Sequence, residues 1–170
     1  MIKTYGMQHI GFTVPNMDQA VDFFETVFGG VTVLETGLID VDNEFMAAKL
    51  GVPGDRRIQN IKVLRVGNGT NLEIFQYSGE EVDEPLKRNS QPGGFHMAFE
   101  VDDANKAAER LREAGVDVLE GPTFIEEGPM EGLTWVYLRA PWGQFLELVS
   151  MDGPLGYEKD GGPKAWSPFS

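Results

Sequence analysis

The chain has 170 residues, of which 41% are hydrophobic and 24% charged, so we expect a folded globular protein rather than a disordered or membrane-spanning one. Acidic residues outnumber basic ones by 27 to 14, and the net charge of −13 argues against nucleic-acid and membrane partners. The absence of cysteine excludes disulfides, thiolate catalysis and thiolate metal sites, and only two histidines, His9 and His96, are present. With no signal peptide at the start of the chain, we expect a cytoplasmic protein.

The first half of the chain predicts a strand, a helix and three further strands. Alternating apolar residues indicate a strand over 8–14, and apolar residues at helical spacing follow the cap residue Asn16 until Gly29-Gly30 ends the helix. The strands expected next are 31–35, 57–66 and 71–77. Residues 40–54, between the first two of these strands, contain NEFMAAKLG, which we expect to form an inserted short helix.

The second half repeats the same order of elements. We expect a strand over 95–101, a helix over 103–114, and strands over 117–119, 134–139 and 144–150. A shift of 87 residues places His9 on His96, and a shift of 74 places Glu73 on Glu147. We therefore expect a single domain, 1–151, built from two βαβββ modules at about 5–78 and 93–151. Residues 152–170 are rich in glycine and proline, and we expect an irregular tail that docks on the body or on a neighbouring subunit.

Residue parity places four potential metal ligands on one kind of strand face. Side chains alternate between the faces of a strand, so His9, Glu73, His96 and Glu147 all point away from their apolar neighbours. Taken alone, each is more often a hydrogen-bonded histidine or a solvent-facing glutamate. The metal hypothesis depends on both histidines and both glutamates falling at equivalent repeat positions. Two imidazoles and two carboxylates suit a divalent first-row metal, with Zn, Ni, Co, Mn and Fe all open.

The segments HIGFTV, GFHMAFEV, NLEIF and APWGQFLEL carry a family resemblance. Residues 5–151 resemble the vicinal oxygen chelate superfamily, which includes glyoxalase I, epimerases, extradiol dioxygenases and bleomycin-resistance proteins. The resemblance implies an α+β fold in which paired βαβββ modules form a cupped mixed sheet around a metal site. It also implies that His9, Glu73, His96 and Glu147 are the metal ligands, and we expect a homodimer.

The resemblance further implies an enzyme that transfers a proton on a small α-hydroxycarbonyl substrate, such as a hemithioacetal or a sugar or cyclitol ketone. The metal would act as Lewis acid, and Glu147 or Glu73 as the base. Glyoxalase-like isomerisation (a lactoylglutathione lyase activity) and epimerisation both stay open. A small-molecule binding or resistance protein of the same fold is the alternative. A ring-cleaving dioxygenase is disfavoured because no third histidine exists to assist oxygen chemistry.

Some further residues are candidates for the surroundings of the site. Phe75 and Phe145 lie two residues from a predicted glutamate ligand and are expected to share its face as pocket walls. Trp135 and Tyr137 alternate with Val136 near the ligand face; we expect them in the hydrophobic core, with a place in the pocket lining as the alternative. Arg56 and Arg57 would bind a substrate carboxylate or be solvated.

Overall fold

The computed structural model describes residues 2–79, 86–161 and 163–169. The chain divides into two compact units, residues 1–84 and 85–170, and each is described by itself. Within the described residues, no helix combines the length and the apolar character needed to cross a membrane.

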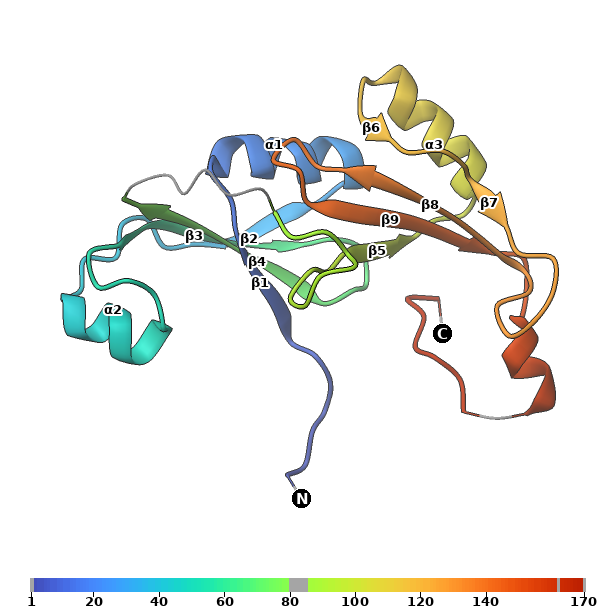
Figure 1. Ribbon diagram of the computed structural model, residues 1–170, viewed down its shortest axis with the longest axis horizontal. Coiled ribbons are helices and arrows are strands. Elements are labelled where there is room, and N and C mark those ends of the chain that lie inside the picture. The colour runs from blue at the N-terminus through green and yellow to red at the C-terminus, as the bar shows by residue number, and fades with distance from the viewer. Residues whose placement is uncertain (1, 80–85, 162, 170) are drawn as a thin grey trace. The chain divides into compact units, whose positions relative to one another are not determined.

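The N-terminal unit is a four-stranded mixed sheet with two helices (Figure 1). In chain order its elements are β1 (His9–Thr13), α1 (Met17–Phe28), β2 (Val31–Glu35), α2 (Asn43–Leu50), β3 (Arg57–Arg65) and β4 (Asn71–Ser78). The strand order is β1-β4-β3-β2, in which β1 runs parallel to β4 and the other pairs are antiparallel. The predicted inserted helix corresponds to α2.

Helix α1 forms for the local reasons that its sequence indicates. The side chain of Asn16 accepts a hydrogen bond from the backbone N–H of Gln19, and Gly29 ends the helix in the left-handed conformation at φ 65°. The helix contacts β3 and β4. The core of this unit consists mainly of buried apolar side chains from α1 and the strands: Phe12, Val14, Met17, Ala20, Phe24, Leu64, Leu72 and Ile74.

Arg57, the first residue of β3, binds the inserted segment 40–54 through its side chain. Its guanidinium donates hydrogen bonds to the Asn43 side chain (2.7 Å) and to the carbonyl of Gly54 (2.9 Å), and it lies 3.5 Å from an Asp40 carboxylate oxygen. These partners all belong to the segment that leads to and from α2. We therefore assign Arg57 to the fold and not to substrate binding.

The C-terminal unit is a mixed sheet with one α-helix and a short 3-10 helix (Figure 1). Its elements are β5 (Met97–Glu100), α3 (Ala104–Glu113), β6 (Asp117–Val118), β7 (Thr123–Phe124), β8 (Leu133–Arg139), β9 (Phe145–Met151) and η1 (Gly156–Asp160). The strand order is β5-β9-β8-β6, β5 is parallel to β9, and β7 pairs with β8. Both units combine mixed sheets with few helices, which confirms the expected α+β class.

Two short elements of the C-terminal unit were not predicted. Strand β7 has only two residues, too few for an alternating pattern, and it exists because it pairs with β8. Helix η1 lies in the segment that we expected to be irregular. Its first residues are held by the 128–131 loop, since Gly156 N–H donates to the Glu131 carbonyl and Tyr157 N–H donates to the Pro129 carbonyl. Both elements therefore depend on tertiary contacts.

Candidate metal centre

In the N-terminal unit, strand pairing brings His9 and Glu73 together on the face opposite the core. The core face is defined by Ile10 beside Leu72 and Phe12 beside Ile74, in the parallel register of β1 and β4. His9 and Glu73 alternate with these residues and so point the other way. His9 Nε2 lies 3.3 Å from Glu73 Oε2. The predicted pairing of these two residues on one face is therefore observed.

Two neighbouring residues, Gln8 and Gly11, affect the orientation and the surroundings of the His9–Glu73 pair. The side-chain oxygen of Gln8 contacts Nδ1 of His9, which leaves Nε2 directed at Glu73. A ligand histidine is commonly oriented in this way through its second nitrogen. Gly11, beside Glu73 in the register, has no side chain on this face, and a Cβ there would lie 3.5 Å from Glu73 Oε2. Sequence reasoning did not identify Gln8 or Gly11, although both adjoin predicted ligands.

The C-terminal unit contains the equivalent pair. Leu146 and Leu148 of β9 are buried in the core, so Glu147 between them points to the opposite face. His96 lies one residue before β5, and its Nε2 is 3.1 Å from Glu147 Oε2. Each unit thus contributes one imidazole and one carboxylate at close range.

The two pairs differ in exposure to solvent. The Glu147 side chain is 14% exposed and that of Glu73 is 27% exposed, while the histidine side chains are 35% exposed for His96 and 46% for His9. Burial raises the pKa of Glu147 above its ordinary value, against the opposing effect of the nearby His96. The C-terminal pair is the more shielded one.

Aromatic side chains surround the C-terminal pair. Tyr137 lies opposite Glu147 in the antiparallel register, and its ring meets the His96 ring edge-on at 5.1 Å between centroids. Trp135 and Phe145 pack edge-on against Tyr137 at 5.5 and 6.2 Å. The pKa of Tyr137 is raised, mainly by burial and further by the charge of Glu147. The expectation that Trp135 and Tyr137 belong to the core is wrong, because both are half-buried on the Glu147 face.

The N-terminal pair has a smaller aromatic surround. Phe75 follows Glu73 by two residues on β4, shares its face and stacks on Tyr77 at 5.8 Å with an interplanar angle of 9°. The pKa of Tyr77 is raised, first by burial and then by the charge of Glu73. The predicted sharing of a face holds for Phe75 with Glu73 and for Phe145 with Glu147, since each pair is two residues apart on one strand.

The donor atoms suit a divalent metal. Two ligands that are each about 2.1 Å from one metal ion, at angles between octahedral and tetrahedral, lie about 3.0 to 3.4 Å apart. The His–Glu separations of 3.1 and 3.3 Å fall in this range. Among the described residues no three His, Asp or Glu side chains gather in a metal-binding group, so each unit by itself contributes a pair.

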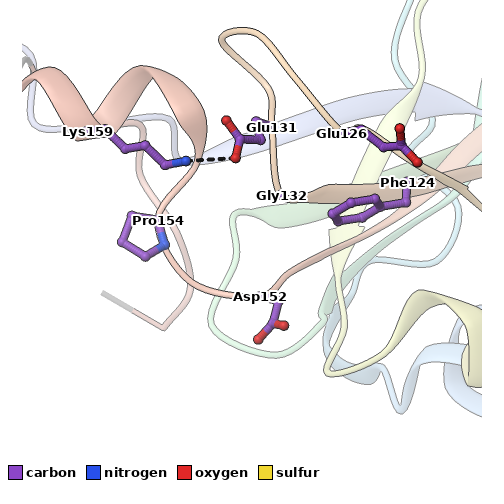
Figure 2. A pocket seen from close by; sticks show the side chains of 7 residues that line it. All are labelled: Phe124, Glu126, Glu131, Gly132, Asp152, Pro154 and Lys159. Carbon is purple, nitrogen blue, oxygen red and sulfur yellow. Dashed lines mark hydrogen bonds and ion pairs between the residues drawn. The ribbon is translucent and has the colours of Figure 1, made fainter.

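A cavity in the C-terminal unit lies apart from these residues. Its volume is about 440 Å³, and it is lined by Phe124, Glu126, Glu131, Gly132, Asp152, Pro154 and Lys159 (Figure 2). Phe124 pairs with Thr134, which in turn pairs with Ser150. The Ser150 hydroxyl accepts a hydrogen bond from the Ala104 N–H at the start of α3, so this row is on the helix side of the sheet. Phe124 therefore lies on the face opposite Glu147, and the lining of the cavity includes none of the four candidate ligands.

Comparison with known proteins identifies the family. Residues 8–131 match the model of the Glyoxalase/Bleomycin resistance protein/Dioxygenase superfamily. The chain belongs to this superfamily. It is also 39% identical to 2-epi-5-epi-valiolone epimerase from Actinomyces sp. over 163 residues, which cover 95% of this chain and 88% of that protein. The expected family is confirmed.

Solved structures of superfamily members share the fold. A glyoxalase family protein from Bacillus cereus has a TM-score of 0.70 at 18% identity, covering 89% of this chain and 97% of that chain. The fosfomycin resistance protein FosX from Listeria monocytogenes, solved with Mn(II) and sulfate, has a TM-score of 0.55 at 17% identity and covers 90% of this chain and 96% of that chain. At these identities the likeness concerns the fold alone.

Proposed function

We propose that the protein is a metal-dependent epimerase of a cyclitol ketone, namely 2-epi-5-epi-valiolone or a close relative of it. The observation that carries the proposal is the match to a valiolone epimerase over nearly the whole chain. That match confirms the expected isomerase or epimerase class. It favours epimerisation over the glyoxalase reaction, the ring-cleaving reaction and a purely binding role, all of which the sequence pattern alone leaves open.

We propose His9, Glu73, His96 and Glu147 as the ligands of one divalent metal ion, contributed by the two units of one chain or by two chains of a homodimer. The separation within each His–Glu pair and the two-to-two balance of neutral imidazoles and carboxylates support this assignment. Two carboxylates balance a dication, so the assembled group has little net charge to desolvate. A metal held there supplies a Lewis acid that polarises a substrate carbonyl.

The protein's own residues then move the proton. A carboxylate, Glu147 or Glu73, accepts the proton from the carbon beside the carbonyl, and the electron pair of that C–H bond moves toward the carbonyl oxygen. Return of a proton to the opposite side of the same carbon inverts its configuration. We propose Glu147 as the first base because it is the less exposed of the two and lies within the aromatic group formed with Tyr137. The aromatic side chains keep water from the reacting carbon.

Deuterium exchange tests the reaction. The protein, loaded with Mn²⁺ or Zn²⁺, is incubated with 2-epi-5-epi-valiolone in D₂O and followed by NMR. We expect the epimer to form with one deuteron at the inverted carbon, and chelation of the metal to stop both events. Binding of the ketone with no deuterium uptake under any metal would contradict the epimerase and favour a binding protein.

Elemental analysis tests the ligand set. We expect His9→Ala and His96→Ala each to lower the bound metal well below one per site, because each removes one of four donors. Undiminished metal in both variants would remove these residues from the site. Light scattering tests the expected homodimer. The cytoplasmic location stays a prediction.

A further inference from the structure

The C-terminal segment returns onto the sheet face that carries Glu147. The register of β5 with β9 places Ala98 beside Glu147 and Glu100 beside Val149, while Met97 and Phe99 alternate with them toward the core side. Glu100 therefore shares a face with Glu147, one row of residue pairs further along, about 7 Å away. The Ser167 hydroxyl donates a hydrogen bond of 2.8 Å to Glu100 Oε2. This contact holds the end of the chain next to the candidate site.

The start of the same segment is fixed on the 128–131 loop. Leu155 is buried, and a Cβ at Gly156 would lie 2.1 Å from the Gly128 carbonyl oxygen, so only glycine permits this approach. Lys159 Nζ reaches Glu131 at 2.9 Å (Figure 2). The segment is thus anchored both where it leaves the sheet and where it returns to it.

Trp166 lies between two residues, Ala165 and Ser167, that are each held by a hydrogen bond. The Ala165 N–H donates to the Tyr157 hydroxyl at 2.9 Å, and Ser167 on the other side binds Glu100. The Trp166 side chain is nevertheless 67% exposed. A large indole on a fixed backbone, left uncovered beside a candidate site, provides a flat apolar surface and an N–H donor for a ligand.

We propose that residues 163–167 form a specificity-determining wall of the substrate site, in which Trp166 contacts the C–H face of a compact hydroxylated ring. This inference rests on the proposed function. The wall lies at the row beyond Glu147, so in this proposal it closes that side of the site to a substrate with a long arm. It therefore selects a cyclitol ketone over an extended acyl thioester. The match with the valiolone epimerase covers 95% of this chain, so it extends beyond residue 155, where the C-terminal segment begins.

Kinetics with three variants test the wall. Trp166→Ala removes the contact and Ser167→Ala removes the bond to Glu100. Phe169→Ala is the matched control, because Phe169 is a similarly exposed aromatic residue that follows the wall and is not part of it. We expect the first two to raise KM for the ketone about tenfold with kcat within about twofold, the size of one lost aromatic contact. We expect the control to change neither. An unchanged KM, or a loss confined to kcat, would overturn the proposal.

An acyl-CoA thioester used as a competitor tests the selection itself. We expect it to inhibit Ser167→Ala and Trp166→Ala but not the wild-type protein or Phe169→Ala. Equal inhibition of all four would show that the segment excludes nothing and would overturn the proposal.

Hydrogen exchange separates this proposal from the proposed function. In the wild type the Phe169 N–H donates to the Ser167 hydroxyl, so we expect Ser167→Ala to speed exchange at that amide without any ligand. We expect the ketone to slow exchange over 163–169 in the wild type and not in Trp166→Ala. If the protein epimerises the ketone but the ketone does not slow hydrogen exchange over 163–169, the proposed wall is overturned and the proposed function is kept. If the ketone slows exchange there but is not epimerised, the proposed function is overturned and the wall is kept.

Discussion

The two units carry equivalent histidine–glutamate pairs in unequal surroundings. In the N-terminal unit the His9 side chain is nearly half exposed, and Gly11 places no side chain beside Glu73. The Gln8 side chain contacts the Nδ1 atom of His9. In the C-terminal unit Ala98 stands at the position equivalent to Gly11, and Tyr137 packs against His96. The same residue types are therefore more exposed to solvent in the N-terminal unit, and more shielded, with an aromatic ring against the histidine, in the C-terminal unit.

This difference indicates a division of labour between the two units. The candidate ligand positions carry the same residue types in both units, because in the proposed site His and Glu provide the nitrogen and oxygen donors. The positions around them differ between the units, and these differences change how far each pair is exposed to water. We expect the C-terminal unit to determine proton transfer and substrate fit, and the N-terminal unit mainly to supply ligands.

Exchanging each glutamate for its neutral isostere gives the largest expected effect. We expect Glu147→Gln to lower the rate of substrate deuterium exchange about 10³-fold and Glu73→Gln about 10²-fold, because only the former loses the proposed first base. Single-turnover NMR in D₂O measures both. Glu109→Gln, on the exposed face of α3, is the control and should match the wild type. Equal losses at the two glutamates would contradict the division of labour.

Truncation of equivalent core residues tests whether the two units are alike away from the site. Ile74 and Leu148 occupy matching repeat positions and are both fully or almost fully buried. We expect Ile74→Ala and Leu148→Ala each to lower the free energy of unfolding by about 2–5 kcal/mol, measured by urea denaturation. Leu34→Ala, at a half-exposed position, should cost less than about 1 kcal/mol. If only one of the two core substitutions lowered the free energy of unfolding by this amount, the two cores would differ in packing, as the two His–Glu pairs differ in their surroundings.

Introducing one residue of the C-terminal unit at the equivalent position of the N-terminal unit gives the smallest expected effect, a change in the free energy of unfolding. Gly11→Ala reproduces the residue found at Ala98, and its Cβ would make ordinary contacts with Glu73 and Phe75. Because Gly11 has no positive φ, we expect the free energy of unfolding to rise by about 0.4–1 kcal/mol through reduced entropy of the unfolded chain. Thermal denaturation measures the change, and a clear destabilisation would show that the Glu73 side chain needs that space.

Much of the fold follows from local patterns. The cap at Asn16, the stop at Gly29 and the alternation around His9 each depend on a few neighbouring residues, so the sequence predicts α1, the main strands and the inserted helix α2. Strand β7 and helix η1 depend on partners distant in the chain and have no comparable local signal. Trp135 and Tyr137 were misplaced because bulky aromatic residues suit a core and an enclosed site equally well.

The sequence by itself determined the four candidate ligands, because strand parity converts one residue of offset into one face of a sheet. It also determined the superfamily, whose motifs surround those ligands. Only the tertiary structure decided how each pair is shielded and what adjoins it. Tyr137 shields Glu147 and contacts His96, and Ser167 binds Glu100. The partners in these contacts are ten to about seventy positions apart in the chain. Contacts over such distances leave no periodic pattern in the sequence.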